Sequence, residues 1–427
     1  MKRFFIISLS LANATAMLWL TFFMLAIPQV LPDEYALVQW TSIGKNLVLK
    51  LEKKPDSSSI LFVNVAWDKV LIDKPDPDIP ELIIGSEPIT DRNKLIALLK
   101  ILHKKPHHRM IVFDIFFKGK SEHDSTLTAL LNTLPNCLVS FHRDERDKPD
   151  YPDLKLNSKT MTLSDLEKSW GMAMKFKIFH NNEFKSTPLQ MYERLYKKKF
   201  SKGSWFFYID DQPVLNSFIL DYRVRRFDYT NSRYPHFNLG EWVDPAYKVV
   251  PIRDIPTNYN LDSIDHTYTE KFIHNFTKNR LIFVGDFEDR DIHETIYGAT
   301  PGPLVLLDAF LAIEAGDNKI HFSFLALLFT AYFFVSYLVF GFRQIYPHWI
   351  ERLIYKTNTH RETFFETFTI LAIYMAVLSI FSFFTYSVHI GVLVLAFYLN
   401  ILEKIKQYIL KVVEKRALKA KLKAANN

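Results

Sequence analysis

Long runs of apolar residues stand near the two ends of the chain, and a stretch of mixed composition separates them. The runs cover residues 4–27, 322–342 and 364–384, followed by a shorter one at 388–402. A helix needs about 20 apolar residues to cross the ~30 Å hydrocarbon core of a bilayer. The pattern therefore predicts four transmembrane helices, one N-terminal and three C-terminal, around one large domain.

The first run has two possible interpretations. Lys2 and Arg3 precede it, as they would in a secretory signal peptide. However, the apolar part of a signal peptide is usually about 7–15 residues long and ends at a cleavage site of small residues. This run is longer and ends in Pro28 and Pro32. We therefore expect an uncleaved anchor.

Lysine and arginine near the predicted helices indicate their orientation, because such residues are enriched on the cytoplasmic side. They precede the first helix, occur between the second and third, and dominate the final segment, whereas the turn around Ser387 has none. The residues are Lys2, Arg3, Arg343, Arg352, Lys356, Arg361, Lys404, Lys406, Lys411, Lys415, Arg416, Lys419, Lys421 and Lys423. Both termini are then cytoplasmic, and the large domain faces outward.

These assignments divide the chain into four parts. Residues 1–31 form the cytoplasmic N-terminus and first helix, and 32–319 form the extracytoplasmic domain. Residues 320–403 form the other three helices, with a short cytoplasmic loop at 343–363, and 404–427 form a basic tail.

The formal net charge of +7 lies almost entirely in the tail, so the large domain is close to neutral. This argues against nucleic-acid binding, which needs a basic face on a folded domain. A basic segment beside a membrane more often contacts anionic lipid headgroups. Ile405, Tyr408, Ile409 and Val412 follow helical spacing, which predicts an amphipathic continuation of the last helix. Docking to a partner protein is the alternative role of this helix.

Cys137 is the only cysteine, so an intramolecular disulfide and a thiolate-rich metal site are both excluded. A large outward-facing domain without disulfides fits a bacterial envelope better than a eukaryotic secretory route.

The domain's short β-branched runs alternate with helical patterns, which predicts an α/β fold with a mainly parallel sheet. Strands are expected at 60–66, 110–117, 136–141 and 280–285, and helices at 91–102, 125–134, 188–198 and 303–315. A hairpin turning at Asn181 and Asn182 is expected within 172–186, and a long loop at 228–265. The first and last thirds of the domain would thus build one sheet, with an insertion between them.

Three carboxylates, Asp68, Asp114 and Asp286, stand at or just after predicted strand ends. Ligands bind outside the carboxyl ends of strands in parallel α/β sheets, so these groups could face one cavity. Asp289, Asp291 and His293 alternate in the following segment, which ends at Thr295. The candidate ligand-binding residues are Asp68, Asp114, Asp286, Asp291, His293 and Thr295. Such groups could bind a ligand or a divalent cation, or perform acid–base work. Aspartate at a strand end also commonly caps a helix or closes a turn.

The chain resembles the type-two CHASE domain proteins, which are bacterial receptors with an extracytoplasmic sensor between one transmembrane helix and three more. The similar stretches are 63–68, the Arg92 helix leading to 111–117, the Asp124 helix, and 281–285 with the loop to Pro303. The resemblance implies a sensory role without defining a ligand. Members of that family usually carry a cytoplasmic enzyme after the last helix, whereas a short basic segment follows Leu402 here.

The leading hypothesis is therefore a bacterial inner-membrane sensor or scaffold subunit that is not itself an enzyme and uses no cofactor. Its outer domain would recognise a periplasmic ligand or envelope partner. The predicted helix at 303–315 would connect the cavity at the strand ends to the second span. Membrane lipids, a separate membrane or cytoplasmic effector protein, and a homo- or hetero-oligomer are the expected partners. The alternatives are a structural envelope subunit and, more weakly, an outward-facing metal-dependent hydrolase using Asp114, Asp286, Asp291 and His293.

Overall fold

The computed structural model describes residues 2–51, 53–76, 79, 81–104, 107–225, 229–230, 237–238, 241–242, 247–255, 277–341 and 364–425. The expected loop at 343–363 and most of that at 228–265 lie outside these residues. The chain forms two compact units. One, the helical unit, comprises 1–50, 212–219 and 318–427, and the other, the α/β unit, comprises 51–211 and 220–317. Residues 32–50 pack within the helical unit.

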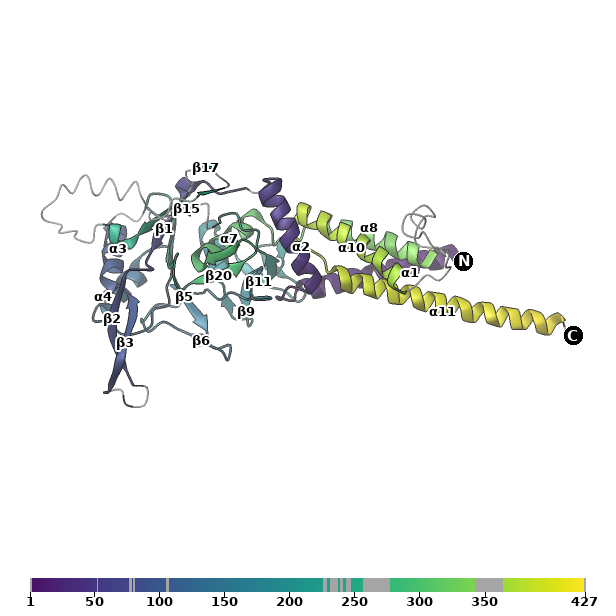
Figure 1. The fold of residues 1–427 in the computed structure, drawn as a ribbon, viewed down its shortest axis with the longest axis horizontal. Helices are drawn as coiled ribbons and strands as arrows, with labels where there is room; N and C mark the ends of the chain where they lie inside the picture. The colour runs from purple at the N-terminus through teal and green to yellow at the C-terminus, as the bar shows by residue number, and fades with distance from the viewer. Residues whose placement is uncertain are drawn as a thin grey trace. The chain divides into compact units, whose positions relative to one another are not determined.

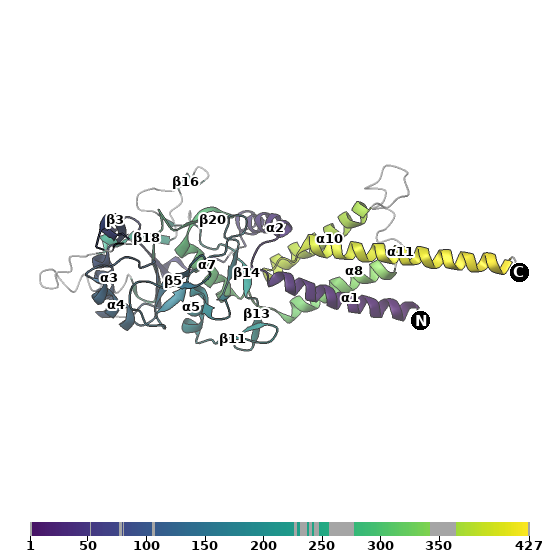
Figure 2. The same cartoon turned by 90° about the horizontal axis from the view of Figure 1, so that it is seen from below.

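The helical unit is built mainly from long helices (Figures 1 and 2). Its elements are α1 (Lys2–Leu25), α2 (Pro32–Ile43), the π-helix η1 (Gly44–Val48), strands β13 (Gln212–Val214) and β14 (Ser217–Ile219), α8 (Phe322–Gly341), α10 (Phe364–Tyr386) and α11 (Val392–Ala425). Within the described residues, three helices are long and apolar enough to cross a membrane, at Arg3–Leu25, Phe322–Gly341 and Thr367–Tyr386. The helical part of the run at 388–402 continues into the tail as one helix, α11, as the spacing of Ile405, Tyr408, Ile409 and Val412 predicted, and α11 is not among these three candidate spans.

Buried polar side chains join the helices of this unit. Asn13 Nδ2 of α1 donates a 2.8 Å hydrogen bond to Ser336 Oγ of α8. At the turn between α10 and α11, the His389 ring lies 2.9 Å from both Thr41 Oγ1 and Ser379 Oγ. Such hydrogen bonds hold helices together where hydrocarbon offers no competing partner.

The α/β unit contains a central sheet whose strand order is β15-β18-β1-β19-β4-β5-β6, with β7 also paired to β5. The strands are β15 (Tyr229–Thr230), β18 (Tyr247–Pro251), β1 (Ile60–Asn64), β19 (Leu281–Gly285), β4 (Met110–Asp114), β5 (Cys137–Arg143), β6 (Pro149–Asp150) and β7 (Met161–Leu163). All pairs are parallel except β5 with β6. The expected joining of early and late segments in one mainly parallel sheet is confirmed, since β19 lies between β1 and β4.

Helices and small hairpins surround this sheet. The helices are η2 (Ser57–Ser59), α3 (Arg92–Lys104), α4 (Asp124–Thr133), α5 (Thr187–Tyr196), η4 (Ile252–Asp254) and α7 (Gly302–Ala315). The remaining strands are β2 (Lys69–Pro75), β3 (Ile83–Thr90), β8 (Lys175–Lys177), β9 (Phe179–His180), β10 (Phe184–Lys185), β11 (Phe200–Lys202), β12 (Phe207–Ile209), β16 (Phe237–Asn238), β17 (Glu241–Trp242), β20 (Ile292–Thr295) and β21 (Gly298–Pro301). The predicted turn at Asn181 and Asn182 joins β9 to β10, and both asparagines have positive φ.

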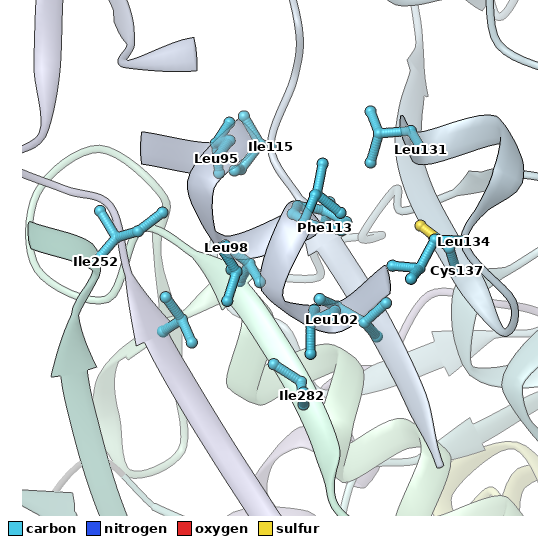
Figure 3. Close-up of a cluster of buried hydrophobic side chains, with 14 of the residues drawn as sticks. Leu95, Leu98, Leu102, Phe113, Ile115, Leu131, Leu134, Cys137, Ile252 and Ile282 are labelled. Atoms are coloured by element: carbon cyan, nitrogen blue, oxygen red, sulfur yellow. The ribbon is translucent and has the colours of Figure 1, made fainter. Parts of the chain in front are cut away.

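Alternation along the central strands produces the core. Leu61 and Val63 of β1 belong to the buried cluster that α3 and α4 also contribute to. Figure 3 shows part of this cluster, including Leu98 of α3, Leu131 of α4 and Ile282 of β19. Phe62 points to the opposite face and packs against Phe287, with ring centroids 5.2 Å apart. Strands buried on both faces read as continuous apolar runs, which is why the sequence revealed them.

Candidate functional site

A cavity of about 670 Å³ lies in the α/β unit at the carboxyl ends of its parallel strands. Its position follows from the register of the sheet, because Gly285 at the end of β19 lies beside both Asn64 of β1 and Asp114 of β4. Only glycine fits at position 285, because a Cβ there would lie 2.5 Å from Pro303 Cγ. The walls are Val65, Lys69, Glu87, Pro88, Ile89, Thr90, Arg92, Asp114, Ile115, Phe116, Lys118, His142, Arg143, Asp144, Asp147, Ser164, Asp165, Leu166, Asp286, Arg290, Asp291, His293, Gly302 and Leu306.

Asp114 is the last residue of β4 and accepts a 2.9 Å hydrogen bond from Ser140 Oγ of β5. Ser140 continues into a buried hydroxyl chain, with Oγ–Oγ 2.5 Å to Ser164. Burial, reinforced by the negative charge of Asp291, raises the pKa of Asp114 to about 7. This carboxyl group can therefore hold or release a proton near neutral pH.

Asp291 and His293 form the second carboxylate element of the cavity. His293 Nε2 lies 2.8 Å from Asp291 Oδ1. The other carboxylate oxygen of Asp291 lies against Gly302, where a Cβ would approach it to 2.1 Å. Gly302 also donates its backbone N–H to the Asp291 carbonyl oxygen at 2.8 Å. The first residue of α7 is therefore joined directly to the cavity wall.

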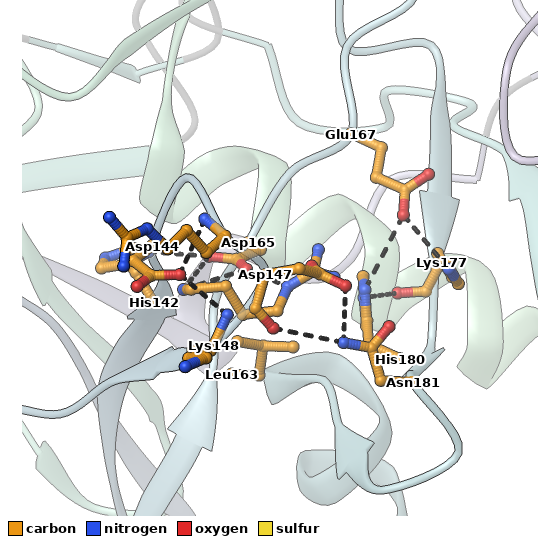
Figure 4. Close-up of polar contacts among 12 residues, drawn as sticks. His142, Asp144, Asp147, Lys148, Leu163, Asp165, Glu167, Lys177, His180 and Asn181 are labelled. Carbon is orange, nitrogen blue, oxygen red and sulfur yellow. Dashed lines mark hydrogen bonds and ion pairs between the residues drawn. The ribbon is translucent and has the colours of Figure 1, made fainter.

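His142, Arg143 and Asp165 form an ion-pair cluster on the β5 side of the cavity (Figure 4). Arg143 Nε donates to Asp165 Oδ2 at 2.6 Å, and His142 Nδ1 lies 3.2 Å from Asp165 Oδ1. Burial alone would lower the pKa of His142, but the hydrogen bond to Asp165 and nearby carboxylates raise it overall. Burial likewise opposes the charge of Asp165, yet hydrogen bonds from His142 and Arg143 lower its pKa. These opposite shifts favour a charged pair.

Two further cations of the wall are anchored by the protein. Arg92 is buried with its guanidinium 4.7 Å from the centre of the Phe117 ring, and its Nε lies 3.4 Å from Asp124 Oδ1. Lys118 Nζ lies 2.7 Å from Asp150 Oδ1. Ion pairs of this kind shape a polar wall but leave little of the cation's charge for a ligand.

The sequence-predicted residues are distributed unequally around this cavity. Asp114, Asp286, Asp291 and His293 line it, whereas Asp68 and Thr295 are not among its lining residues. Asp68 pairs with Lys94 at 2.5 Å. Thr295 Oγ1 donates to the Gly298 carbonyl at 2.9 Å within the β20–β21 hairpin.

Asp286 has a structural role even though it lines the cavity. Its carboxylate accepts backbone N–H groups of Glu288, Asp289 and Arg290 at 3.0, 2.8 and 3.2 Å. It therefore closes the turn after β19, which is the alternative role that aspartate at a strand end commonly takes.

Sequence reasoning missed His142, Arg143, Asp165 and Lys69. The first three follow or end β5 and β7, so the strand-end rule that selected Asp114 also applies to them. Lys69 belongs to the unpredicted β2–β3 hairpin and had no such signal. Within the described part of the chain, no group of three or more His, Cys, Asp or Glu side chains is arranged to hold a metal ion.

Comparisons with known proteins found no matching protein-family model, no matching curated protein and no matching solved structure. The site must therefore be interpreted from its own geometry.

Proposed function

We propose that this chain is a multi-pass receptor subunit of a bacterial inner membrane, whose α/β unit binds a small molecule in the periplasm. The observation that most supports this proposal is the cavity of about 670 Å³ at the carboxyl ends of the parallel strands. This is where α/β sheets bind ligands, and the volume lies within the usual range for small-molecule sites. The resemblance to type-two CHASE sensors points to the same role, and membership of that family remains part of the proposal.

Contacts of α11 support a fourth span. Leu393 N donates to Asp33 Oδ2 of α2 at 2.8 Å, just beyond the end of α1. Lys406 Nζ contacts the Val339 carbonyl oxygen in the last turn of α8. Residues 393–406 of a helix extend about 20 Å. Long basic side chains can reach the interface from within a bilayer, so a charged end does not prevent this helix from crossing.

The proposed orientation rests on the basic segments. Lys2, Arg3 and the eight basic residues of 404–427 would be cytoplasmic, which leaves the α/β unit in the periplasm. The basic part of α11 would contact anionic lipid headgroups, an effector protein, or both.

Chain connectivity suggests how a signal would leave the cavity. Asp291 contacts Gly302, the first residue of α7, and residues 316–321 join α7 to α8. If Asp291 has two positions and the ligand binds one of them more tightly, the ligand shifts the population toward that position. Because Asp291 contacts Gly302, this shift would also favour one position of α7 over another. The effector that receives this bias is proposed to be a separate protein.

The test uses the full chain in lipid nanodiscs. A metabolite extract should raise the unfolding temperature of the wild type and of Asp73→Asn, whose exposed side chain is not part of the cavity lining, but not that of Asp291→Asn. Crosslinking in cells should capture an effector protein in a ligand-dependent manner. Ligand-independent capture with no response to any extract would instead indicate a structural envelope subunit and reject the receptor.

An extracytoplasmic hydrolase is the second candidate, because Asp114 has a pKa near 7 beside Asp291 and His293. Groups that titrate near neutral pH suit acid–base catalysis. Release of product from a hydrolysable substrate, abolished by Asp114→Asn, would favour this candidate over the receptor.

A further inference from the structure

Several cations and carboxylates of the cavity wall fall into two classes, those held in close ion pairs within the protein and those whose charge has only a weak or partial partner. Arg143, Arg92 and Lys118 belong to the first class, since each forms an ion pair with an aspartate of this chain. They contribute walls and hydrogen-bond geometry. The groups of the second class are the ones that a charged ligand could bind.

Lys69 and Arg290 form the basic pole of the cavity. Lys69 is half-buried on β2, and the described residues provide its ammonium group with no hydrogen bond or ion pair within 4 Å. Among acidic groups, Asp286 attracts it most strongly, but the Asp286 carboxylate accepts hydrogen bonds from backbone N–H groups. Arg290 is 60% exposed, and its one ion pair among the described residues, 3.6 Å to the 43%-exposed Asp289, is weakened by solvent. Both cations are therefore available to an anionic group of a ligand.

Asp114 and Asp291 form the acidic pole. Each raises the electrostatic cost of charge on the other, and no lysine or arginine among the described residues pairs with either carboxylate. The partners of Asp114 are the Ser140 hydroxyl group, the Asp291 carboxyl group and, at longer range, His142. The partner of Asp291 is His293. A bound ammonium group would add positive charge and three N–H donors to this pole.

The two poles meet on one loop. Arg290 and Asp291 are consecutive residues that both line the cavity, and consecutive Cα atoms are about 3.8 Å apart. A ligand spanning the poles thus needs its opposite charges only a few bonds apart. A purely anionic or purely cationic molecule would place like charge beside one pole.

We propose that the cavity binds a small zwitterion, with its ammonium group on Asp114 and Asp291 and its carboxylate between Lys69 and Arg290. This assignment rests on the receptor function proposed above and adds the ligand class, an amino acid or a short peptide. The cavity of about 670 Å³ also accommodates a side chain against Ile115, Phe116 and Leu306.

The experiment uses the full chain in nanodiscs, with calorimetry and thermal shift at pH 7.5. The zwitterionic probes are γ-aminobutyrate, L-glutamine and dialanine, and the single-charge probes are butyrate and butylamine. At least one zwitterion should bind, and the single-charge probes should bind at least tenfold more weakly. Lys69→Met and Asp291→Asn should each weaken binding of the zwitterion at least tenfold, whereas the matched controls Lys74→Met and Asp73→Asn, at exposed positions outside the cavity lining, should not.

Two results would overturn this assignment. One is that no zwitterion of the panel binds, and the other is that butyrate or butylamine binds as well as the zwitterions. If the metabolite extract still stabilises the wild type but not Asp291→Asn, the ligand class is wrong and the receptor stands. If no probe or extract acts, both proposals fail. Unfolding temperatures without ligand show whether each variant is folded, and Lys69→Met, at a half-buried position, tests the basic pole independently of Asp291.

Discussion

Tyr398 of α11 donates a 2.7 Å hydrogen bond from its hydroxyl group to Asn13 Oδ1, in the middle of α1. The same asparagine donates to Ser336 of α8 through Nδ2. One buried side chain therefore joins the N-terminal span to two C-terminal helices. Tyr398 therefore lies beside the middle of α1, a contact that supports the proposed fourth span without reference to hydropathy.

Replacement of Asn13 by alanine should loosen the helical unit. The change removes two interhelical hydrogen bonds, each worth about 0.5–2 kcal/mol in a membrane protein. We expect easier unfolding of the full chain in a detergent titration and weaker crosslinking between cysteines placed in α1 and α11. Thr15→Ala is the control, because Thr15 Oγ1 bonds only within α1, to Leu11 O. Equal effects of the two substitutions would mean that Asn13 does not act as an interhelical clamp.

Two glycines at the cavity should respond differently to alanine. A Cβ at Gly285 would lie 2.5 Å from Pro303 Cγ and 3.2 Å from the Asp114 carbonyl oxygen, and neither neighbour can move easily. We expect Gly285→Ala to lower the free energy of unfolding by about 1–3 kcal/mol. A Cβ at Gly302 meets only the end of the Asp291 side chain, which can rotate away from His293.

Gly302→Ala should therefore reduce ligand binding more than stability. Thermal unfolding and calorimetry of both variants provide the comparison. A larger loss of stability in Gly302→Ala than in Gly285→Ala would contradict the assigned packing.

The titration of Asp114 gives a prediction with a definite sign. The pKa of this group is about 7 in the folded chain, against an ordinary value of 3.8. Between these values the folded state binds more protons, so its stability falls as pH rises from about 4 to 7 and stays at the lower value above pH 7. His142 acts in the same direction because its pKa is raised, whereas His180, with a pKa lowered to about 4, acts oppositely below pH 6.5.

Asp114→Asn removes the contribution of Asp114 to the pH dependence of stability. Relative to the wild type, the variant should gain stability on the order of 2 kcal/mol between pH 5 and pH 8. Thermal unfolding at a series of pH values measures this difference, to which Asp291 and His142 contribute because they face Asp114. A difference that does not change with pH would show that Asp114 titrates normally.

Asp308, buried within the apolar helix α7, should be replaceable by asparagine but not by leucine. Its Oδ1 accepts the backbone N–H groups of Arg223 and Val224 at 2.8 and 2.9 Å. Burial raises the pKa of Asp308 well above its ordinary value, so a neutral amide is a close substitute. Asp308→Leu leaves two buried donors unsatisfied, at about 1–3 kcal/mol each. Similar unfolding temperatures for the two variants would reject this role.

The sequence was most informative where burial is complete. Strands β1, β4 and β19 are buried on both faces, so their apolar runs predicted them, and the face of α3 followed from Leu95, Leu98, Leu99 and Leu102. The β2–β3 and β20–β21 hairpins were missed because both are partly exposed and both contain proline. Their formation depends on tertiary packing more than on local pattern.

The site could be predicted only in part. Strand-end position selected Asp114 and Asp286, but it could not show that Asp286 closes a turn or that Asp68 pairs with Lys94. The approach of Asp291 to Gly302 depends on the β20–β21 hairpin and was not readable from spacing. The fourth apolar run was too short to define a span, and its case rests on contacts such as Tyr398–Asn13.

Cysteine labelling in spheroplasts tests the receptor topology most directly. The native Cys137 is 3% exposed and burial raises its pKa to about 12, so it should give no background. Trp205 is 83% exposed in the α/β unit, and Lys415 is exposed near the end of α11. A membrane-impermeant maleimide should label Trp205→Cys in intact spheroplasts, and Lys415→Cys only after lysis. Labelling of Lys415→Cys but not Trp205→Cys in intact spheroplasts would contradict the outward-facing receptor.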